Sequence, residues 1–214
     1  MAKTKRLTAG ARRAQLIATG RTVFAKRGYN ATTVEEIAKA AGVSKPIVYE
    51  HFGGKEGLYA VVVDREMEAL HSRMIKVISS GTPRHRYEQA VLALLTYVQE
   101  HPDGFALLTR DAPMYAGGQG MPAVINELGV RVGDIFREQF TRAGLDARVA
   151  PIYAHSLIGM VVLAGQWWND QQEFSKEEVA SHVAAIGWMG LRHLPAKIEP
   201  LTSPSYDTKD NSDS

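Results

Sequence analysis

The sequence predicts an all-α fold, and three observations lead to this prediction. Apolar residues recur at helical spacing along most of the 214-residue chain. No stretch combines sustained alternation of apolar and polar residues with an excess of β-branched side chains, the pattern typical of a half-buried strand. Glycine, proline and helix-capping residues divide the chain into segments of helical length. The elements can therefore be taken in order as helices and the loops between them.

The N-terminal region predicts a basic arm followed by a helix. Residues 1–10 carry basic side chains without an apolar stripe, and we expect them to be disordered. From Arg12 onward, apolar residues form one stripe at i, i+1, i+4, i+7 and i+8. The members of this stripe are Leu16, Ile17, Gly20, Val23 and Phe24. Gly28 is expected to end the helix, because glycine is a frequent C-terminal stop.

Two short helices separated by a glycine come next. Thr33 and Glu36 form a capping box that predicts a helix over residues 34–41. Gly42 marks a sharp turn with a positive φ, and Ser44 can cap the following helix, which should end just before a Gly-Gly pair. This arrangement is the helix-turn-helix unit, whose second helix enters the major groove of DNA.

The outward side chains of this unit suit contacts with DNA, so residues 11–57 are interpreted as a DNA-binding domain. Lysine can reach a phosphate or a guanine edge, tyrosine and histidine can donate to phosphates, and apolar side chains can contact a thymine methyl group. The candidate DNA-binding residues are Thr33, Ser44, Lys45, Pro46, Ile47, Tyr49, Glu50, His51 and Lys55. Tyr49 and His51 could instead pack against neighbouring helices, and the Glu50 carboxylate must find a base edge or be repelled by phosphate.

The remainder of the chain predicts six further helices, most of them longer. They are expected over residues 55–80, 84–101, 103–115, 122–143, 146–170 and 176–194. Residues 116–120 form a glycine-rich loop between two of them. Residues 199–214 have few apolar side chains and are expected to be a disordered tail.

Composition excludes several classes of protein. Hydrophobic residues make up 45% and charged residues 22%, ordinary globular values that exclude wholesale disorder. The absence of cysteine excludes disulfides, thiolate metal sites and cysteine nucleophiles, and the seven histidines contain no i, i+4 metal pair. The longest unbroken run of apolar residues and glycine, Leu157–Gly165, is shorter than the ~18 residues of a membrane span. With no apolar signal core after Met1–Arg6, we expect a soluble cytoplasmic protein without a membrane partner.

Charge is distributed unevenly along the chain. Residues 1–60 contain 11 Lys and Arg against 4 Asp and Glu, a balance of +7. Residues 61–214 contain the other 14 Lys and Arg against 19 Asp and Glu, a balance of −5. A basic head on an acidic body suits binding to a polyanion, although on charge alone a solvated basic surface explains it equally well.

The helix-turn-helix segment resembles a known family. Residues Thr32–Leu58, preceded by Phe24–Tyr29, resemble the signature of TetR-family transcriptional regulators. The resemblance implies a nine-helix chain with a three-helix head, acting as a homodimer on a palindromic operator in double-stranded DNA. By the same resemblance, the DNA contacts of the family fall on Thr33, Lys45, Pro46, Tyr49, Glu50, His51 and Lys55. The pair Gly53-Gly54 departs from the family, in which Lys, Ser or Asp is frequent.

Residues 58–198 are interpreted as a ligand-binding and dimerisation domain. The predicted helices 146–170 and 176–194 match the dimerisation pair of the family in place and order. The first is apolar nearly all round, so a second subunit can supply part of its cover. A charge at Val161 or Gly187 is therefore expected to give monomers or insoluble protein, because a buried unpaired charge is costly. An intramolecular core alone is the alternative interpretation.

The middle helices are expected to surround a pocket for an effector. Aromatic and methionine side chains abound there, and the polar groups among them would need partners if buried. The candidate ligand-binding residues are Phe105, Arg110, Met114, Phe136, Phe140, Tyr153, Leu157, Gln166 and Trp167. The segments Gly165–Asp170 and Arg110–Pro113 resemble TetR-type regulators of fatty-acid synthesis. This resemblance implies a small hydrophobic or amphipathic effector such as a long-chain acyl-CoA.

Enzyme classes find no support in the sequence. Gly54-Lys55 lacks the first glycine and the Ser/Thr of a P-loop, and the segment after His155 lacks the glycines of a nucleophile elbow. No cofactor and no metal are expected. The sequence favours a ligand-responsive transcriptional regulator, expected to be a repressor. A DNA-binding architectural or regulatory protein without a small-molecule effector is the alternative.

Overall fold

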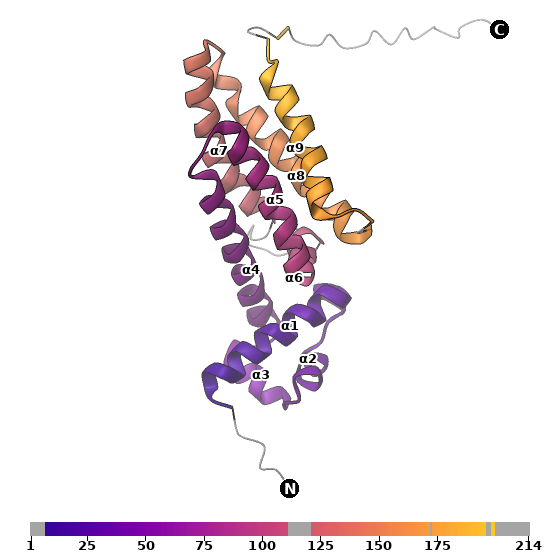
Figure 1. Ribbon diagram of the computed structural model, residues 1–214. Coiled ribbons are helices and arrows are strands. Elements are labelled where there is room, and N and C mark those ends of the chain that lie inside the picture. The colour runs from indigo at the N-terminus through magenta and orange to yellow at the C-terminus, as the bar shows by residue number, and fades with distance from the viewer. Residues whose placement is uncertain (1–6, 111–120, 172, 196–197, 200–214) are drawn as a thin grey trace, which may run out of the picture.

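The computed structural model describes residues 7–110, 121–171, 173–195 and 198–199 (Figure 1). These residues are almost all helical and include no strand, which confirms the all-α prediction. The helices are α1 (Ala9–Ala31), α2 (Val34–Ala41), α3 (Lys45–Phe52), α4 (Lys55–Ile78), α5 (Pro83–Glu100), α6 (Pro102–Arg110), α7 (Met121–Ala143), α8 (Ala150–Gln171) and α9 (Lys176–Arg192), with a 3-10 turn, η2 (Ala147–Val149). The predicted loop 116–120, and most of the predicted arm and tail, lie outside the described residues.

The molecule has a small head and a longer body (Figure 1). Helices α1, α2 and α3 form the head at one end. Helix α4 leaves the head and extends into the body, where it contacts α5, α6 and α7. Its 24 residues, at about 1.5 Å each, span roughly 36 Å. A single helix therefore belongs to both parts of the molecule.

Helix α1 begins three residues earlier than the apolar stripe predicts. The Thr8 hydroxyl accepts a hydrogen bond from the Ala11 amide (3.2 Å) and caps the helix. Ala9 and Gly10, which were expected in the disordered arm, are therefore helical. Gly28 interrupts the helix with a φ of 78° and a ψ of 162°, in agreement with its expected role as a stop.

The turn between α2 and α3 has the expected positive φ at Gly42, 64°. The Gly42 amide donates to the Lys39 carbonyl (3.2 Å) and the Val43 amide donates to the Ala38 carbonyl (2.9 Å). These two bonds form a Schellman motif, which glycine favours because it has no Cβ to oppose a left-handed backbone. Ser44 is exposed at the N-cap position of α3, but its side chain makes no capping bond.

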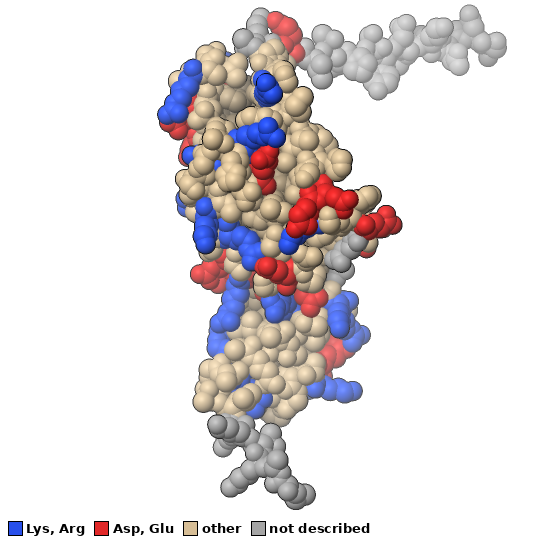
Figure 2. Space-filling view, in the orientation of Figure 1, with Lys and Arg blue, Asp and Glu red and all other residues tan. Residues whose placement is uncertain are grey.

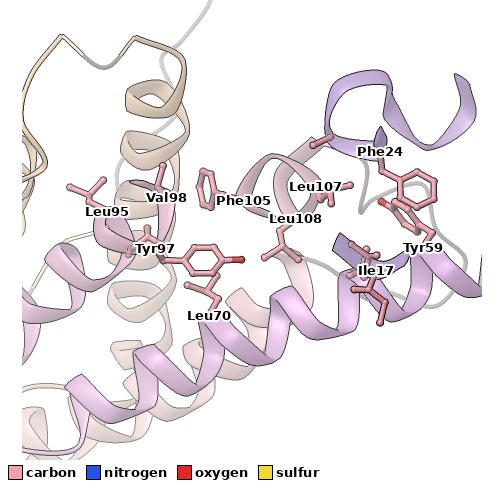
Figure 3. Packing of buried hydrophobic residues seen from close by; sticks show 14 of the residues in the cluster. Ile17, Phe24, Tyr59, Leu70, Leu95, Tyr97, Val98, Phe105, Leu107 and Leu108 are labelled. Carbon is pink, nitrogen blue, oxygen red and sulfur yellow. The ribbon is translucent and has the colours of Figure 1, made fainter. Parts of the chain in front are cut away.

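One hydrophobic core runs from the head into the body (Figure 3). Phe24 of α1 packs edge-on against Tyr59 of α4, with ring centroids 5.0 Å apart. Leu108 of α6 and Leu95 of α5 continue this core and are almost fully buried. Since α1 packs against both α4 and α6, the head cannot tilt without disturbing the packing of the body.

Helices α8 and α9 are not enclosed within one chain. Trp168 of α8 is buried, but Ile152, Leu163 and Trp167 are exposed by 64%, 66% and 49%. The segment 147–171 is also long and apolar enough, by length and composition alone, to span a membrane. A few polar residues interrupt this helix, so the length of the longest unbroken apolar run did not indicate its overall apolar character.

Gly187 and Val161 are buried against their own chain. A Cβ at Gly187 would lie 2.6 Å from Cζ of Tyr87 on α5, so glycine allows α9 to approach α5 closely. Val161 belongs to the hydrophobic core. A charge at either position would disrupt the packing of the single chain as well, so insoluble protein is the expected outcome and neither site separates dimerisation from folding.

Candidate DNA-binding head and effector cavity

One face of α3 presents most of the expected DNA contacts. Lys45, Pro46, Tyr49 and Glu50 are exposed, whereas Val48 is fully buried in the core of the head. Positions i, i+1, i+4 and i+5 form one continuous stripe on a helix. Tyr49 is 53% exposed, so its hydroxyl is accessible on the outer surface rather than packed against α1 or α4.

The candidates at the edge of this face are held by the rest of the head. Ile47, His51 and Lys55 are half-buried. The His51 carbonyl accepts a hydrogen bond from Nη1 of Arg13 (2.8 Å). Nζ of Lys55 donates to the Tyr29 carbonyl (3.0 Å) and lies 4.3 Å from the centroid of the Tyr29 ring. These contacts fix the end of α3 and the start of α4 relative to α1.

Acidic side chains of α2 pair with cations of the head. Lys45 forms an ion pair with Glu35, and Arg27 forms one with Glu36. The predicted capping box is present, with the Thr33 amide 3.0 Å from Oε2 of Glu36 and the Glu36 amide 3.3 Å from Oγ1 of Thr33. The hydrogen bond from the Thr33 amide holds the pKa of Glu36 below its usual value. Exposed ion pairs contribute little stability, so a phosphate can replace Glu35 as the partner of Lys45.

Charged side chains are unevenly placed on the face shown in Figure 2. Asp and Glu lie mostly on the body, and the head below shows a largely uncharged surface with Lys and Arg at its margins. This distribution agrees with the charge asymmetry of the sequence.

Two buried residues, Glu66 and Tyr97, and the half-buried Arg21 join the head to the body, and we call these three the junction cluster. Glu66 of α4 is only 7% exposed. Its Oε1 accepts a hydrogen bond from Nη1 of Arg21 on α1 (2.9 Å), and its Oε2 accepts one from the Tyr97 hydroxyl on α5 (2.9 Å). Burial, and then the charge of Glu66, raises the pKa of Tyr97 well above its usual value, so the hydroxyl stays a donor. Thr22 of α1 adds a second link, donating to Asp103 of α6 (2.9 Å).

Gly104 of α6 packs directly against the junction cluster. A Cβ at this position would lie 2.7 Å from Cδ of Glu66 and 3.1 Å from the Tyr97 hydroxyl. Sequence reasoning missed this cluster and its contact with Gly104, because no local pattern relates residues on four different helices.

The body contains an elongated, partly open cavity of about 340 Å³ among α4, α5, α7, α8 and α9. Its lining consists mostly of Leu, Ile, Val and aromatic side chains. Along α7 the lining extends from Ile125 to Ala143, 18 residues or roughly 27 Å at about 1.5 Å each. The charged members of the lining are Arg86 and Arg192. An apolar cavity of this size with a few polar groups is typical of a small-molecule site.

Three of the predicted ligand-binding residues line this cavity: Phe136, Phe140 and Leu157. Tyr153 is not part of the lining, but it packs edge-on against Phe140 with ring centroids 5.2 Å apart. The predicted residues that line the cavity therefore all lie on α7 or on the first half of α8.

The other predicted ligand-binding residues lie elsewhere. Phe105 of α6 is fully buried in the hydrophobic core. Gln166 is half-buried and Trp167 is exposed, both on the second half of α8. The side chain of Arg110 and the whole of Met114 lie outside the described residues.

Sequence reasoning missed the lining that α4, α5 and α9 contribute. Arg86 and Tyr87 of α5 and Trp188 and Arg192 of α9 all reach the cavity. Helix α9 was interpreted as a dimerisation helix alone, although Trp188 and the exposed Ile186 lie on different faces of it. The bulky aromatic residues Tyr87 and Trp188 were the available signal.

Family comparisons agree with this architecture. The family model described as bacterial regulatory proteins, tetR family, matches residues 16–62, and that of the tetracyclin repressor-like C-terminal domain matches residues 77–200. The second match alone covers more than half of the chain. The chain belongs to the TetR family. It is therefore a transcriptional regulator with a helix-turn-helix DNA-binding head, and the resemblance of residues Thr32–Leu58 is confirmed.

Similar proteins include other TetR-family regulators. The HTH-type transcriptional activator FasR of Mycolicibacterium smegmatis is 30% identical over 193 residues, which are 89% of this chain and 87% of that protein. The HTH-type transcriptional repressor KstR2 of Rhodococcus jostii is 36% identical over 70 residues, 33% of this chain and 34% of that protein.

Solved structures share the fold at lower identity. The fatty acid degradation regulator FadR from Bacillus halodurans superposes with a TM-score of 0.71 at 16% identity, covering 89% of this chain and 100% of that one. AibR, solved in complex with isovaleryl coenzyme A and operator DNA, has a TM-score of 0.68 at 20% identity, covering 82% of this chain and 97% of its own. At such identities the likeness concerns the fold alone.

Proposed function

We propose that this TetR-family regulator binds a palindromic operator in double-stranded DNA as a homodimer and responds to a small effector in its body. The observation that carries the proposal is the combination, in one chain, of an exposed α3 face and an apolar cavity in the body. Two α3 helices related by a two-fold axis would read inverted half-sites with centres about 10 base pairs apart. A role on operator DNA supports a cytoplasmic location, which we include in the proposal.

The proposed DNA contacts follow from position and exposure. Lys45 and Tyr49 would reach phosphates or base edges, and Pro46 would contact a thymine methyl group. Thr33 and Ser44 are the exposed N-cap residues of α2 and α3, so their hydroxyls and the positive ends of these helices can face a phosphate. The remaining proposed contacts are Ile47, Glu50, His51 and Lys55.

The dimer is proposed to form through α8 and α9. Ile152, Leu163 and Trp167 follow one another at i, i+11 and i+15, which places them on one face of α8. Ile186 and Met189 extend this exposed apolar surface onto the neighbouring α9. Apolar surface of this extent marks an interaction site, and a second copy of the same face is the proposed occupant.

The effector is proposed to be hydrophobic or amphipathic, such as a long-chain acyl-CoA. The apolar, elongated lining supports a chain-like ligand rather than a compact polar one. The isovaleryl coenzyme A in the AibR complex and the fatty acid degradation named for FadR support the same class. That the chain represses transcription stays a prediction, since its relatives are named as both activator and repressor.

Operator binding in Lys45→Ala tests the DNA-binding proposal. If each half-site neutralises ~4 phosphates, the log–log salt slope of the wild type should be about −7. Losing one contact per subunit should weaken binding and reduce the slope to about −5. Lys76→Ala, an exposed change at the far end of α4, is the matched control and should bind as the wild type does. Unchanged affinity in Lys45→Ala would remove Lys45 from the site, and binding blind to sequence would contradict an operator.

Ligand response separates the proposal from the architectural alternative. A coupling of ~1–3 kcal/mol would change operator affinity by ~5–150-fold. We expect at least one acyl compound to raise the melting temperature and to shift operator affinity within this range. An architectural protein would bind DNA equally well with and without every compound tested.

A further inference from the structure

The effector cavity has one charged end and one apolar end. Arg86 lines it in the first turns of α5, and Arg192 lines it as the last residue of α9. Ile78 and Ala143, the last residues of α4 and α7, line the same end. Helix α4 runs away from the head toward its last residue, so this end of the cavity lies in the part of the body remote from the head (Figure 1).

Neither arginine is neutralised within the described part of the chain. Nε of Arg86 donates to the Gly81 carbonyl (2.8 Å), which leaves its terminal amines for another acceptor. Glu88, two residues further along α5, is paired with Arg84 (2.7 Å). No ion pair among the described residues includes Arg86 or Arg192. Guanidinium groups in this state beside an apolar cavity suit a carboxylate or phosphate ligand.

The opposite end of the cavity lies on the two helices, α4 and α5, that carry Glu66 and Tyr97 of the junction cluster. Leu70 lines that end and lies one helical turn after Glu66 on α4. Leu94 lines it from α5 and precedes Tyr97 by three residues. Figure 3 shows Leu70 beside Tyr97. No charged side chain lines this end among the described residues, so a ligand charge placed there would have no partner.

We propose that the cavity binds an anionic group attached to an apolar chain, in one direction only. Arg86 and Arg192 hold the anion, and the chain points toward Leu70 and Leu94. This inference rests on the proposed effector site and adds the chemistry and the direction of its ligand. The chain then ends beside the helices that carry the junction cluster, so ligands of different chain length press differently on the link between body and head.

The anion is tested with three probes of equal chain length: hexadecanoate, its methyl ester and hexadecanoyl-CoA. Fluorescence of Trp188, which lines the cavity, reports binding. The charged probes should bind at least about tenfold more tightly than the ester, because a charge-assisted hydrogen bond contributes that much. Arg86→Gln and Arg192→Gln should lose this preference and keep their affinity for the ester. Arg84→Gln, on the same helix and outside the lining, should retain it.

The direction is tested with a fatty acid that carries a photoreactive group on its last carbon. Cross-links should fall on peptides that contain Leu70 or Leu94. Cross-links around Arg192 would overturn the direction. Equal affinity for acid and ester, or an undiminished preference in both cavity variants, would overturn the anion site and leave an apolar effector in place. If none of the three probes binds, both this inference and the acyl effector fail, while operator binding is judged separately by Lys45→Ala.

A comparison of the two charged probes identifies the source of the anion. Tighter binding of hexadecanoyl-CoA, lost in both cavity variants, assigns the arginines to a phosphate of the coenzyme. Tighter binding of hexadecanoate assigns them to a free carboxylate. Each result supports an anion at this end of the cavity.

Discussion

Replacing Gly104 with alanine would test whether the junction cluster holds the head and the body together. The new Cβ would lie 2.7 Å from Cδ of Glu66, closer than real Cβ contacts allow, and a tight 3.1 Å from the Tyr97 hydroxyl. Gly104 is buried on α6, so the backbone cannot easily retreat. The Glu66 carboxylate must move instead, and its bonds to Arg21 and Tyr97 (2.9 Å each) would lengthen or break.

The magnitude follows from these bonds. A hydrogen bond to a charged group contributes about 1.5–3 kcal/mol, so losing one or both costs roughly 2–6 kcal/mol. Alanine in place of glycine within a helix returns about 1 kcal/mol. The expected net loss in the free energy of unfolding is therefore about 1–5 kcal/mol. For a chain of this size, each kcal/mol lowers the melting temperature by about 2–4 °C, so the expected drop is roughly 2–20 °C.

A second variant makes this prediction specific. Glu66→Ala is itself destabilising, but it vacates the space into which the Gly104→Ala methyl group points. In the Glu66→Ala background, Gly104→Ala should therefore be neutral or stabilising by up to about 1 kcal/mol. Thermal and urea unfolding of the two single variants and the double variant measure this reversal of sign. If Gly104→Ala lowers stability equally in both backgrounds, the contact with Glu66 is not what limits residue 104.

Two further predictions concern the dimer and the pH dependence of stability. Ile186→Lys places a charge on an exposed apolar site without disturbing the core, so sedimentation should detect monomers, whereas Ser181→Lys on another face of α9 should stay dimeric; a dimeric Ile186→Lys would contradict the proposed interface. Burial raises the pKa of Tyr87 to about 12, against about 10 in an unfolded chain, so its contribution to stability is complete below pH ~10 and is lost as the pH rises toward 12. Tyr87→Phe should therefore lose less melting temperature than the wild type between pH 9.5 and 11.5, and equal losses would show that Tyr87 does not titrate with unfolding.

The head could be predicted closely because its signals are local. Thr33 and Glu36 are three residues apart, and their capping box forms as expected. Gly42 lies one residue beyond the end of α2 and adopts the left-handed conformation that its position requires. Each of these features is decided by neighbours within one or two turns, so the sequence itself contains the whole interaction. The early start of α1 depends on Thr8, an equally local N-cap that the apolar stripe does not include.

The cavity could be predicted only in part, because its walls come from five helices far apart in sequence. Aromatic content correctly indicated Phe136 and Phe140, which line the cavity, but equally indicated Phe105, which fills the core. A buried phenylalanine has the same sequence pattern in both places. Only the packing of one helix on another decides whether it borders a space or a neighbour, and that packing has no local signature. The role of Arg86 could not be predicted for the same reason. Its sequence context is typical of a solvated residue, and only the packing of α9 beside α5 brings Arg86 to the cavity.

Helix α4 gives a physical reason for the cavity and the DNA-binding face to influence each other. Leu58 of α4 is fully buried in the core of the head, Glu66 belongs to the junction cluster, and Leu70 lines the cavity. From Leu58 to Leu70 is 12 residues, roughly 18 Å of continuous helix. A helix transmits a shift along its length better than a loop does, so a ligand that displaces α4 at Leu70 also displaces Leu58 in the core of the head. Such a ligand changes operator affinity only if it binds the two positions of α4 unequally, and by the same linkage operator DNA must then change the affinity of the cavity for the ligand by an equal factor.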